Sequence, residues 1–346
     1  HVLGQTGSGE GTGGAGAIGS NLVNTILNDC EKLIILDDFS SGRSDNLEYL
    51  NSEKVHIVDG DICNQSTIDE AFSYDINQVY HLAANFANQN SVDNTEKDLR
   101  TNGIGIVKVL QASVDNKVEK FLGTSSSCVY KPGDNPFIED GPVELTTPYA
   151  ITKMLSEYYI SFYSKFHKLT SVIIRPFNSY GPGDVPGRFR SVVPNFFLKA
   201  MNGLPLTITG DGSETRPFTY VQDVVNGLVC AMNNSPDKKL KTFGGHPVDN
   251  SDNLIYNIGN DTSITILELA EKINKICQNK AGVEFIPRRD WDKFPNRAVQ
   301  LDKSKNDLNF EIQYDVDTGL KLTYEWFKSQ DFKLENVYEY KGGHLG

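Results

Sequence analysis

The sequence contains no long apolar run. A helix that crosses a bilayer needs about 18 or more consecutive apolar residues, and no segment approaches this length. No N-terminal signal pattern is visible either. We therefore expect a cytoplasmic protein without a membrane partner.

Cysteines are few and far apart, with five in 346 residues. None forms a C-x-x-C pair, and no histidine stands at metal-ligand spacing from them, so the pattern excludes a disulfide framework and a zinc site. We expect reduced thiols and no bound metal. The five are Cys30, Cys63, Cys128, Cys230 and Cys277.

Positive charge is also scarce. The chain has 33 Lys and Arg against 45 Asp and Glu, which gives a formal net charge of −12. This balance argues against nucleic acid or an anionic membrane as the main partner, because little offsets phosphate charge over a wide surface. A small phosphorylated ligand in a locally positive cleft is still compatible with it.

Short β-branched runs alternate with amphipathic stretches in the first half of the chain. Such alternation indicates a parallel sheet covered by helices on both faces. Right-handed crossovers then favour an α/β fold with a doubly wound, Rossmann-like sheet. The expected strands are residues 33–36, 54–58, 78–82, 121–125 and 171–175, and the expected helices are residues 18–30, 66–73, 98–116 and 149–167.

The pattern becomes irregular after about Asn178. We expect a helix near 222–233, a strand over 253–258 and a helix over 263–278 with Ser263 as its N-cap. The chain therefore divides into a sheet domain and a smaller, interleaved substrate lobe. The sheet domain is expected at 1–178 with returning elements near 221–258, and the lobe at 179–220 and 259–346.

Glycines near the start of the sheet domain suit a dinucleotide. Gly13, Gly16 and Gly19 lack a Cβ, which permits a tight turn and close approach of a pyrophosphate to the next helix. Asp37 ends an expected strand 18 positions after Gly19, where a carboxylate can bind the adenosine ribose. A carboxylate there repels a 2′-phosphate, so NAD is favoured over NADP, although Arg43 lies nearby.

The segment before this loop makes a poor strand. Residues 1–11 read HVLGQTGSGEG, in which Val2 and Leu3 are the only large apolar residues. A buried parallel strand is normally a nearly continuous apolar run. Either the first strand is short, or the N-terminus is altered.

Tyr149 and Lys153 stand four residues apart in an expected helix and therefore share one face. A free tyrosine has a pKa of about 10, too high for a base at neutral pH. A lysine ammonium and the positive nicotinamide ring would lower that pKa, so that Tyr149 could take a hydroxyl proton while hydride leaves the same carbon. The serine-rich run 121–130 follows a buried-strand pattern and would bring a hydroxyl to the same crevice.

Together these motifs resemble the extended short-chain dehydrogenases, specifically the NAD-dependent nucleotide-sugar epimerase/dehydratase family, over nearly the whole chain. The pattern is most similar to that of UDP-glucose 4-epimerase-like enzymes. The matching segments are TGGAGAIGS (12–20), LDDFSSGR (36–43), GDI (60–62), VYHLAA (79–84), SSSCVY (125–130), PYAITK (148–153), RPFNSYGP (175–182), GDGSETR (210–216) and YNIGN (256–260).

The resemblance implies roles by position. Ser126, Tyr149 and Lys153 would be catalytic, with Tyr149 as the base. The implied cofactor-binding residues are Gly13, Gly16, Ala17, Ile18, Gly19, Asp37, Asp38, Ser41, Gly42, Asp61, Ile62, Leu82, Ala83, Ala84, Asn102, Tyr149, Lys153 and Phe177. The implied substrate-binding residues are Ser126, Asn178, Arg216 and one of Arg288 and Arg289, with Arg297 as a further candidate for the diphosphate.

The resemblance also implies a first step, in which tyrosinate takes the sugar 4-hydroxyl proton and the C4 hydride moves to NAD. Dehydratases and decarboxylases of the family carry a carboxylate where this chain has Ser127 and Cys128, and a thiol is a poor general acid there. We therefore expect C4 epimerisation of a nucleotide sugar, with UDP as the carrier, through a transient 4-keto intermediate.

Other activities stay open at this point. A decarboxylase or dehydratase of the same family is one alternative, and an NADPH-dependent reductase of a 4-keto deoxysugar is another. A non-enzymatic NAD-sensing interaction protein is the third, and the intact Ser126, Tyr149 and Lys153 set argues against it. The stretches 98–116 and 149–167 match the family's dimer helices, so a homodimer is expected.

Overall fold

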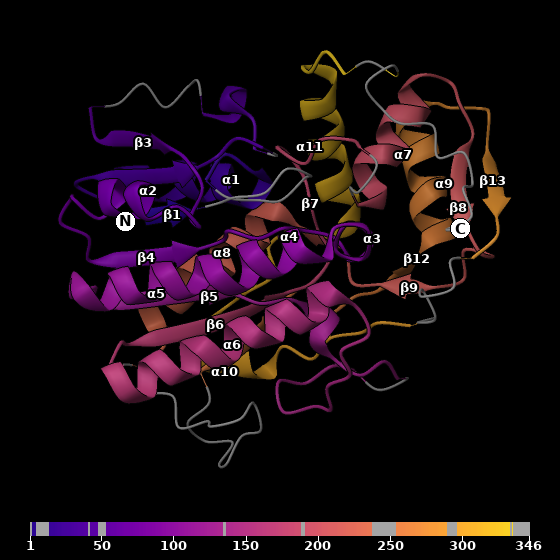
Figure 1. Ribbon diagram of the computed structural model, residues 1–346. Coiled ribbons are helices and arrows are strands. Elements are labelled where there is room, and N and C mark those ends of the chain that lie inside the picture. Colours follow the sequence, from indigo (N-terminus) through magenta and orange to yellow (C-terminus); the bar gives the residue numbers. More distant parts are fainter. Residues whose placement is uncertain are drawn as a thin grey trace.

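The computed structural model describes residues 2–4, 14–40, 42–47, 53–133, 136–187, 191–236, 254–288, 296–332 and 334 (Figure 1). Of the predicted site residues, Gly13, Ser41 and Arg289 lie outside these ranges. In the part of the chain that is described, no helix is both long and apolar enough to cross a membrane.

A parallel sheet of seven strands forms the centre of the molecule (Figure 1). Its order is β11-β6-β5-β4-β1-β2-β3, and each neighbouring pair is parallel. The order reverses between β1 and β4, and doubly wound sheets bind ligands at the carboxyl ends of such strands. The predicted fold class is confirmed. The strands are β1 Val2–Gly4, β2 Leu33–Asp37, β3 Val55–Asp59, β4 Gln78–His81, β5 Lys120–Thr124, β6 Ser171–Pro176 and β11 Ile255–Ile258.

The central strand β1 is only three residues long. Val2 pairs with Ile34 on one side and with Val79 on the other, so β1 lies between β2 and β4. The apolar-poor N-terminus therefore does form the first strand, which is short.

Helices cover both faces of the sheet (Figure 1). One face is covered by α2 (Gln65–Ala71), α5 (Ile106–Asp115) and α6 (Pro148–His167). The other face carries α1 (Ala17–Ile26), α8 (Val221–Asn234) and α10 (Asp302–Leu308).

The helix predicted over 98–116 is interrupted. It consists of α4 (Thr95–Leu99), a π-helical turn (Arg100–Gly105) and α5. α3 (Asn88–Asp93), which the sequence pattern did not predict, precedes it. π-Helical turns are rare and occur frequently at functional sites, and this one contains Asn102.

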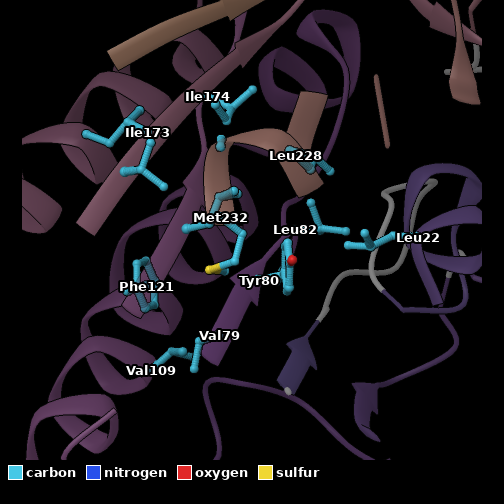
Figure 2. Close-up of a cluster of buried hydrophobic side chains, with 14 of the residues drawn as sticks. Leu22, Val79, Tyr80, Leu82, Val109, Phe121, Ile173, Ile174, Leu228 and Met232 are labelled. Atoms are coloured by element: carbon cyan, nitrogen blue, oxygen red, sulfur yellow. The ribbon is translucent and has the colours of Figure 1, made fainter. Parts of the chain in front are cut away.

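The core between the layers is continuous and apolar. The strands β2 and β5 are buried along their whole length, and β2 is apolar from Leu33 to Leu36. Figure 2 shows part of this core, with side chains of α1, α5 and α8 around those of the central strands. The labelled members are Leu22, Val79, Tyr80, Leu82, Val109, Phe121, Ile173, Ile174, Leu228 and Met232.

A second apolar core lies in the region predicted as the substrate lobe. Phe196, Phe197, Leu269 and Phe327 are buried there, apart from the core of the sheet. Its elements are β7 Ser179–Tyr180, α7 Val192–Met201, β8 Leu206–Thr209, β9 Thr215–Arg216, β10 Thr219–Tyr220, β12 Ile264–Thr265, α9 Ile266–Cys277, β13 Val283–Ile286 and α11 Val316–Lys328. The exact division into two domains stays a prediction.

Part of the predicted lobe belongs with the sheet instead. Val299, Leu301, Leu308 and Phe310 fall in the predicted segment 259–346, yet they are buried in the core of the sheet. α10 packs on α8 and β11, so the chain returns to the sheet domain once more than the sequence pattern indicated.

The predicted N-cap of α9 is wrong by two residues. Thr265, not Ser263, caps the helix: its hydroxyl accepts from the Glu268 backbone N–H, and Glu268 in turn accepts from the Thr265 N–H. Ile264 and Thr265 first pair with β9, which delays the helix start, and the reciprocal pair forms a capping box.

Gly227 tests the contact between α8 and β11. An added Cβ would lie 2.5 Å from Ile258 Cγ2. Alanine gains about 1 kcal/mol of helix propensity over glycine, but overpacking costs about 1–3 kcal/mol. We expect Gly227→Ala to lower the thermal unfolding midpoint, and Ile258→Ala to cost less stability in the Gly227→Ala chain than in wild type, because it removes the crowding atoms. A Gly227→Ala protein as stable as wild type would refute this packing argument.

Candidate active site

Tyr149 stands in the first turn of α6 because two residues before it fix where the helix begins. The Thr147 hydroxyl accepts from the Ala150 N–H at 3.2 Å, and Pro148 occupies the first helical position. The Tyr149 N–H donates to the Ser91 hydroxyl at 3.0 Å. Its side chain is buried at 6% exposure.

Ser126 reaches Tyr149 from the loop after β5. It begins the short helical turn Ser127–Val129, and its hydroxyl accepts from the Cys128 N–H at 3.2 Å. A hydrogen bond from Ser126 to the phenol lowers the pKa of Tyr149, against a larger effect of burial, which raises that pKa well above its ordinary value. The structure thus brings Ser126 and Tyr149 together, as the sequence predicted.

Lys153 completes this group from the next turn of α6. Its Nζ donates to the Thr124 carbonyl at 2.9 Å and lies 5.7 Å from the centroid of the Tyr149 ring. Burial lowers the pKa of Lys153 to about 8. The phenol and the ammonium are therefore adjacent, and each is buried in a setting that disfavours its charged form.

A buried carboxylate that the sequence analysis missed supports this pair. Asp98 is fully buried, and it accepts from the Thr152 hydroxyl at 2.6 Å and from the Asn102 amide at 3.0 Å. Burial raises the pKa of Asp98 to about 6, which Thr152 and Lys153 partly oppose. Asp98 stands four residues before Asn102, a spacing that puts both on one helix face, but nothing local in the sequence marks it as functional.

Asn102 connects this carboxylate to the loop after β4. Its Oδ1 accepts from the Asn85 N–H at 2.7 Å, and its Nδ2 donates to the Asn85 carbonyl at 3.2 Å and to Thr152. The loop that it holds includes Leu82, Ala83 and Ala84, which are buried. Support of the bound cofactor by Asn102 stays a prediction.

The glycine loop is held by Asp37 in a way the sequence did not predict. Asp37 is fully buried; its Oδ2 accepts from the Ala15 N–H at 2.8 Å and its Oδ1 from the Phe39 N–H at 2.9 Å. Burial raises the pKa of Asp37 to about 6. Gly42 packs directly against Ala15 of the glycine loop. A Cβ at position 42 would lie 2.7 Å from the Ala15 Cβ, so only glycine fits there without a shift of the loop. Ribose binding by Asp37 stays a prediction.

The other predicted cofactor residues lie around the same end of the sheet. Gly16 precedes α1 without a side-chain cap, so the first N–H groups of α1 are available to a phosphate. Asp61 accepts from the Cys63 N–H, and Ile62 is fully buried. Phe177 is fully buried in an aromatic cluster with Tyr130 and Phe137. The rest of this set, Ala17, Ile18, Gly19 and Asp38, lies in α1 or directly after β2.

The predicted diphosphate residues differ in what they contact. Asn178 has a left-handed φ of 37°, and its buried Oδ1 has no partner among the described residues. Arg216 is half-buried in β9. Arg288 pairs with Glu214 at 2.5 Å and with Asp211 at 3.7 Å, so its charge is already balanced. Substrate binding by these residues stays a prediction.

A small pocket of about 10 Å³, room for about one water molecule, lies beside Ser126. Arg297 lines it, together with residues from the loop after β5 and from the start of α6. The lining residues are Asn88, Ser127, Cys128, Tyr130, Pro132, Phe137, Thr146, Thr147 and Arg297. Within the described chain, no group of three or more His, Cys, Asp or Glu side chains could hold a metal.

Comparison with known proteins identifies the family. Residues 12–259 match the NAD dependent epimerase/dehydratase family, and the chain belongs to it. The UDP-N-acetyl-alpha-D-glucosaminuronate decarboxylase of Bacillus cytotoxicus is 30% identical over 92% of this chain and 96% of its own length. The UDP-glucose 4-epimerase of Mycolicibacterium smegmatis is 32% identical over 92% and 98%. The structure of an epimerase from Methanothermobacter thermautotrophicus is 41% identical, with a TM-score of 0.83 over 91% of this chain and 90% of that one.

The cofactor is therefore NAD, and the residues present fit it. The uncapped start of α1 suits a pyrophosphate, and a carboxylate ends β2. Arg43, whose positive charge could otherwise favour the 2′-phosphate of NADP, is paired with Asp45.

Asp98 gives a test of the electrostatics around Lys153. The groups that face Lys153 are Asp98 from α4, Glu157 from α6, Cys128 from the turn after β5 and His81 from β4. Glu157 is already paired with Arg175 at 2.7 Å, which leaves Asp98 as the carboxylate that keeps Lys153 protonated.

Removing that negative charge lowers the pKa of Lys153 further, so the ammonium is lost at a lower pH. We expect Asp98→Asn to move the alkaline limb of the kcat/KM profile about one pH unit lower. The exposed Asp115→Asn serves as the control. Superimposable profiles for Asp98→Asn and wild type would contradict this role.

Proposed function

We propose that the protein is a 4-epimerase of a nucleotide sugar, with UDP as the carrier. The observation that carries this proposal is the adjacency of Ser126, Tyr149 and Lys153 at the carboxyl edge of the sheet, next to a pocket without a carboxylate among its described lining residues. Both the epimerase and the decarboxylase relatives act on UDP-sugars by name, which supports the carrier.

The chain's own groups would handle the proton of the sugar 4-hydroxyl. Ser126 would hydrogen-bond the O4 atom, Tyr149 Oη would take its proton, and the Lys153 ammonium would stabilise the phenolate so formed. NAD, when bound, supplies the hydride acceptor and a positive ring near the phenol. Burial raises the pKa of Tyr149, so positive charge near the phenol favours its loss of a proton.

The fate of the resulting 4-keto sugar separates the candidate reactions. Elimination of water needs a properly placed general acid and base, and the decarboxylases of the family carry a carboxylate at this point. This chain places Ser127 and Cys128 in the pocket instead. Without that acid, the simplest outcome is that the keto sugar rotates within the site. C4 is then reduced from its opposite face, and Tyr149 returns the proton to the oxygen.

Tyr149→Phe tests the enzyme proposal. Loss of a general base costs about 10²–10⁴-fold in rate, so we expect kcat to fall by about 10³-fold while the fold and bound NAD are retained. Products from a panel of UDP-sugars would be resolved by NMR, with Tyr159→Phe on the same helix as the control. Full activity in Tyr149→Phe would refute the proposed mechanism. A pentose product would indicate decarboxylation, and a dehydrated product would indicate elimination of water, in place of epimerisation.

We also propose that the protein is a homodimer. α6 exposes an apolar stripe, of which Ile151, Phe162 and Phe166 are 50%, 42% and 53% exposed. Leu99 and Ile104 on the neighbouring helix are 50% and 52% exposed, and α4 packs against α6. Contiguous apolar surface of this kind marks an interface, and a second copy presents the same helices to it.

A charge in this stripe tests the dimer. We expect wild type to sediment at twice the mass of the chain, and Ile104→Glu with Phe162→Glu to sediment as a monomer, because each buried carboxylate would be unpaired. Phe285→Glu changes an equally exposed aromatic at 54% exposure on β13 and should leave the mass unchanged. A monomeric wild type would rule out this proposal.

A further inference from the structure

We propose that Arg175 is a positioning residue of the active site. Its buried guanidinium joins the turn that begins at Ser126 to α6, the helix that carries Tyr149 and Lys153. The inference rests on the proposed function, because it concerns how the reacting groups of that same site are kept in place.

The contact between Arg175 and α6 is a bidentate ion pair. Arg175 lies in β6, and its Nε donates to Glu157 Oε1 at 2.8 Å while its Nη2 donates to Glu157 Oε2 at 2.7 Å. Two parallel hydrogen bonds from a planar guanidinium fix both the position and the orientation of a carboxylate. Glu157 stands four residues after Lys153, so the two side chains share one face of α6. The ion pair therefore ties the helix to β6 one turn away from the lysine.

The remaining contacts of the guanidinium lead to the turn after β5. The guanidinium carbon lies 4.8 Å from the centroid of the Tyr130 ring, and Nη1 donates to the Glu139 carbonyl at 3.1 Å. Tyr130 directly follows the short helical turn that Ser126 begins. The Tyr130 hydroxyl donates to Asn257 Oδ1 on β11 at 2.6 Å. The ring is thus held from two sides, and with it the end of the turn.

Stability alone gives little reason to bury this ion pair. The side chains of Arg175 and Glu157 are only 3% and 5% exposed, and the loss of hydration of two buried charges can exceed their attraction. Apolar side chains of similar volume often replace such pairs without loss of stability. Flexible apolar chains can pack in several ways, whereas the guanidinium fork accepts the carboxylate in one orientation. Fixed geometry is therefore what the pair supplies to α6 and to the turn.

The ion pair also balances charge close to Lys153. The groups that face Lys153 are Asp98 from α4, Glu157 and Tyr149 from α6, Cys128 from the turn after β5 and His81 from β4. The groups that face the guanidinium are Glu157, Tyr130, Glu139 and Lys303. Without the Glu157 carboxylate, the guanidinium would be an unbalanced positive charge near the ammonium, and the pKa of Lys153 would fall.

The test compares Glu157→Gln with the double variant Glu157→Met/Arg175→Met, on the UDP-sugar that wild type turns over fastest. Glu157→Gln leaves the buried guanidinium without its counter-charge, so we expect the thermal unfolding midpoint to fall by about 5 °C. The alkaline limb of its kcat/KM profile should move about half to one pH unit lower.

The double variant removes both charges, so its unfolding midpoint and its alkaline limb should return close to those of wild type. We expect kcat to stay about 10-fold low with KM changed less than about 2-fold, because the fork that holds α6 against the turn is gone. The control is Lys272→Met/Asp317→Met, which removes an ion pair between α9 and α11 and should keep the wild-type kcat. A kcat that recovers together with the unfolding midpoint would show that the pair only stabilises the fold, which overturns the inference. An unshifted alkaline limb in Glu157→Gln would also contradict it.

Hydrogen exchange separates this inference from the proposed function, because it needs no substrate. Backbone amides of residues 126–130 and of the first turn of α6 should exchange faster in the double variant than in wild type, while those of β2 keep their rates. Equal protection of these segments in both proteins would refute the positioning role. A wild type that turns over no UDP-sugar would refute the proposed function, and the exchange rates would still decide the role of Arg175.

Discussion

The site depends on how a buried phenol can lose its proton. Burial raises the pKa of Tyr149 well above its ordinary value and lowers that of Lys153 to about 8. The lysine therefore stays largely protonated at neutral pH, whereas the phenol stays neutral unless positive charge lies close to it. A positively charged cofactor ring next to the phenol shifts this balance, which links proton removal to the presence of oxidised NAD.

A buried polar network packed against α6 holds the groups around Lys153 in place. Asp98 places one negative charge near Lys153, and its hydrogen bonds with Thr152 and Asn102 fix its position. Asn102 lies in the π-helical turn and holds the backbone of Asn85. One interrupted helix thus positions both the charge that supports the lysine and the loop at the carboxyl end of β4.

The sequence predicted the elements whose environment is simple. β2 is buried on both faces and is apolar from Leu33 to Leu36, so it was evident, whereas β13 is half-exposed and carries no such run. Ser126, Tyr149 and Lys153 were found because their motifs are local. Asp98 was not found, because it acts through Thr152, a partner 54 residues away that only the fold brings to it. The same limit applies to the cap of α9, where pairing with β9 decided the helix start.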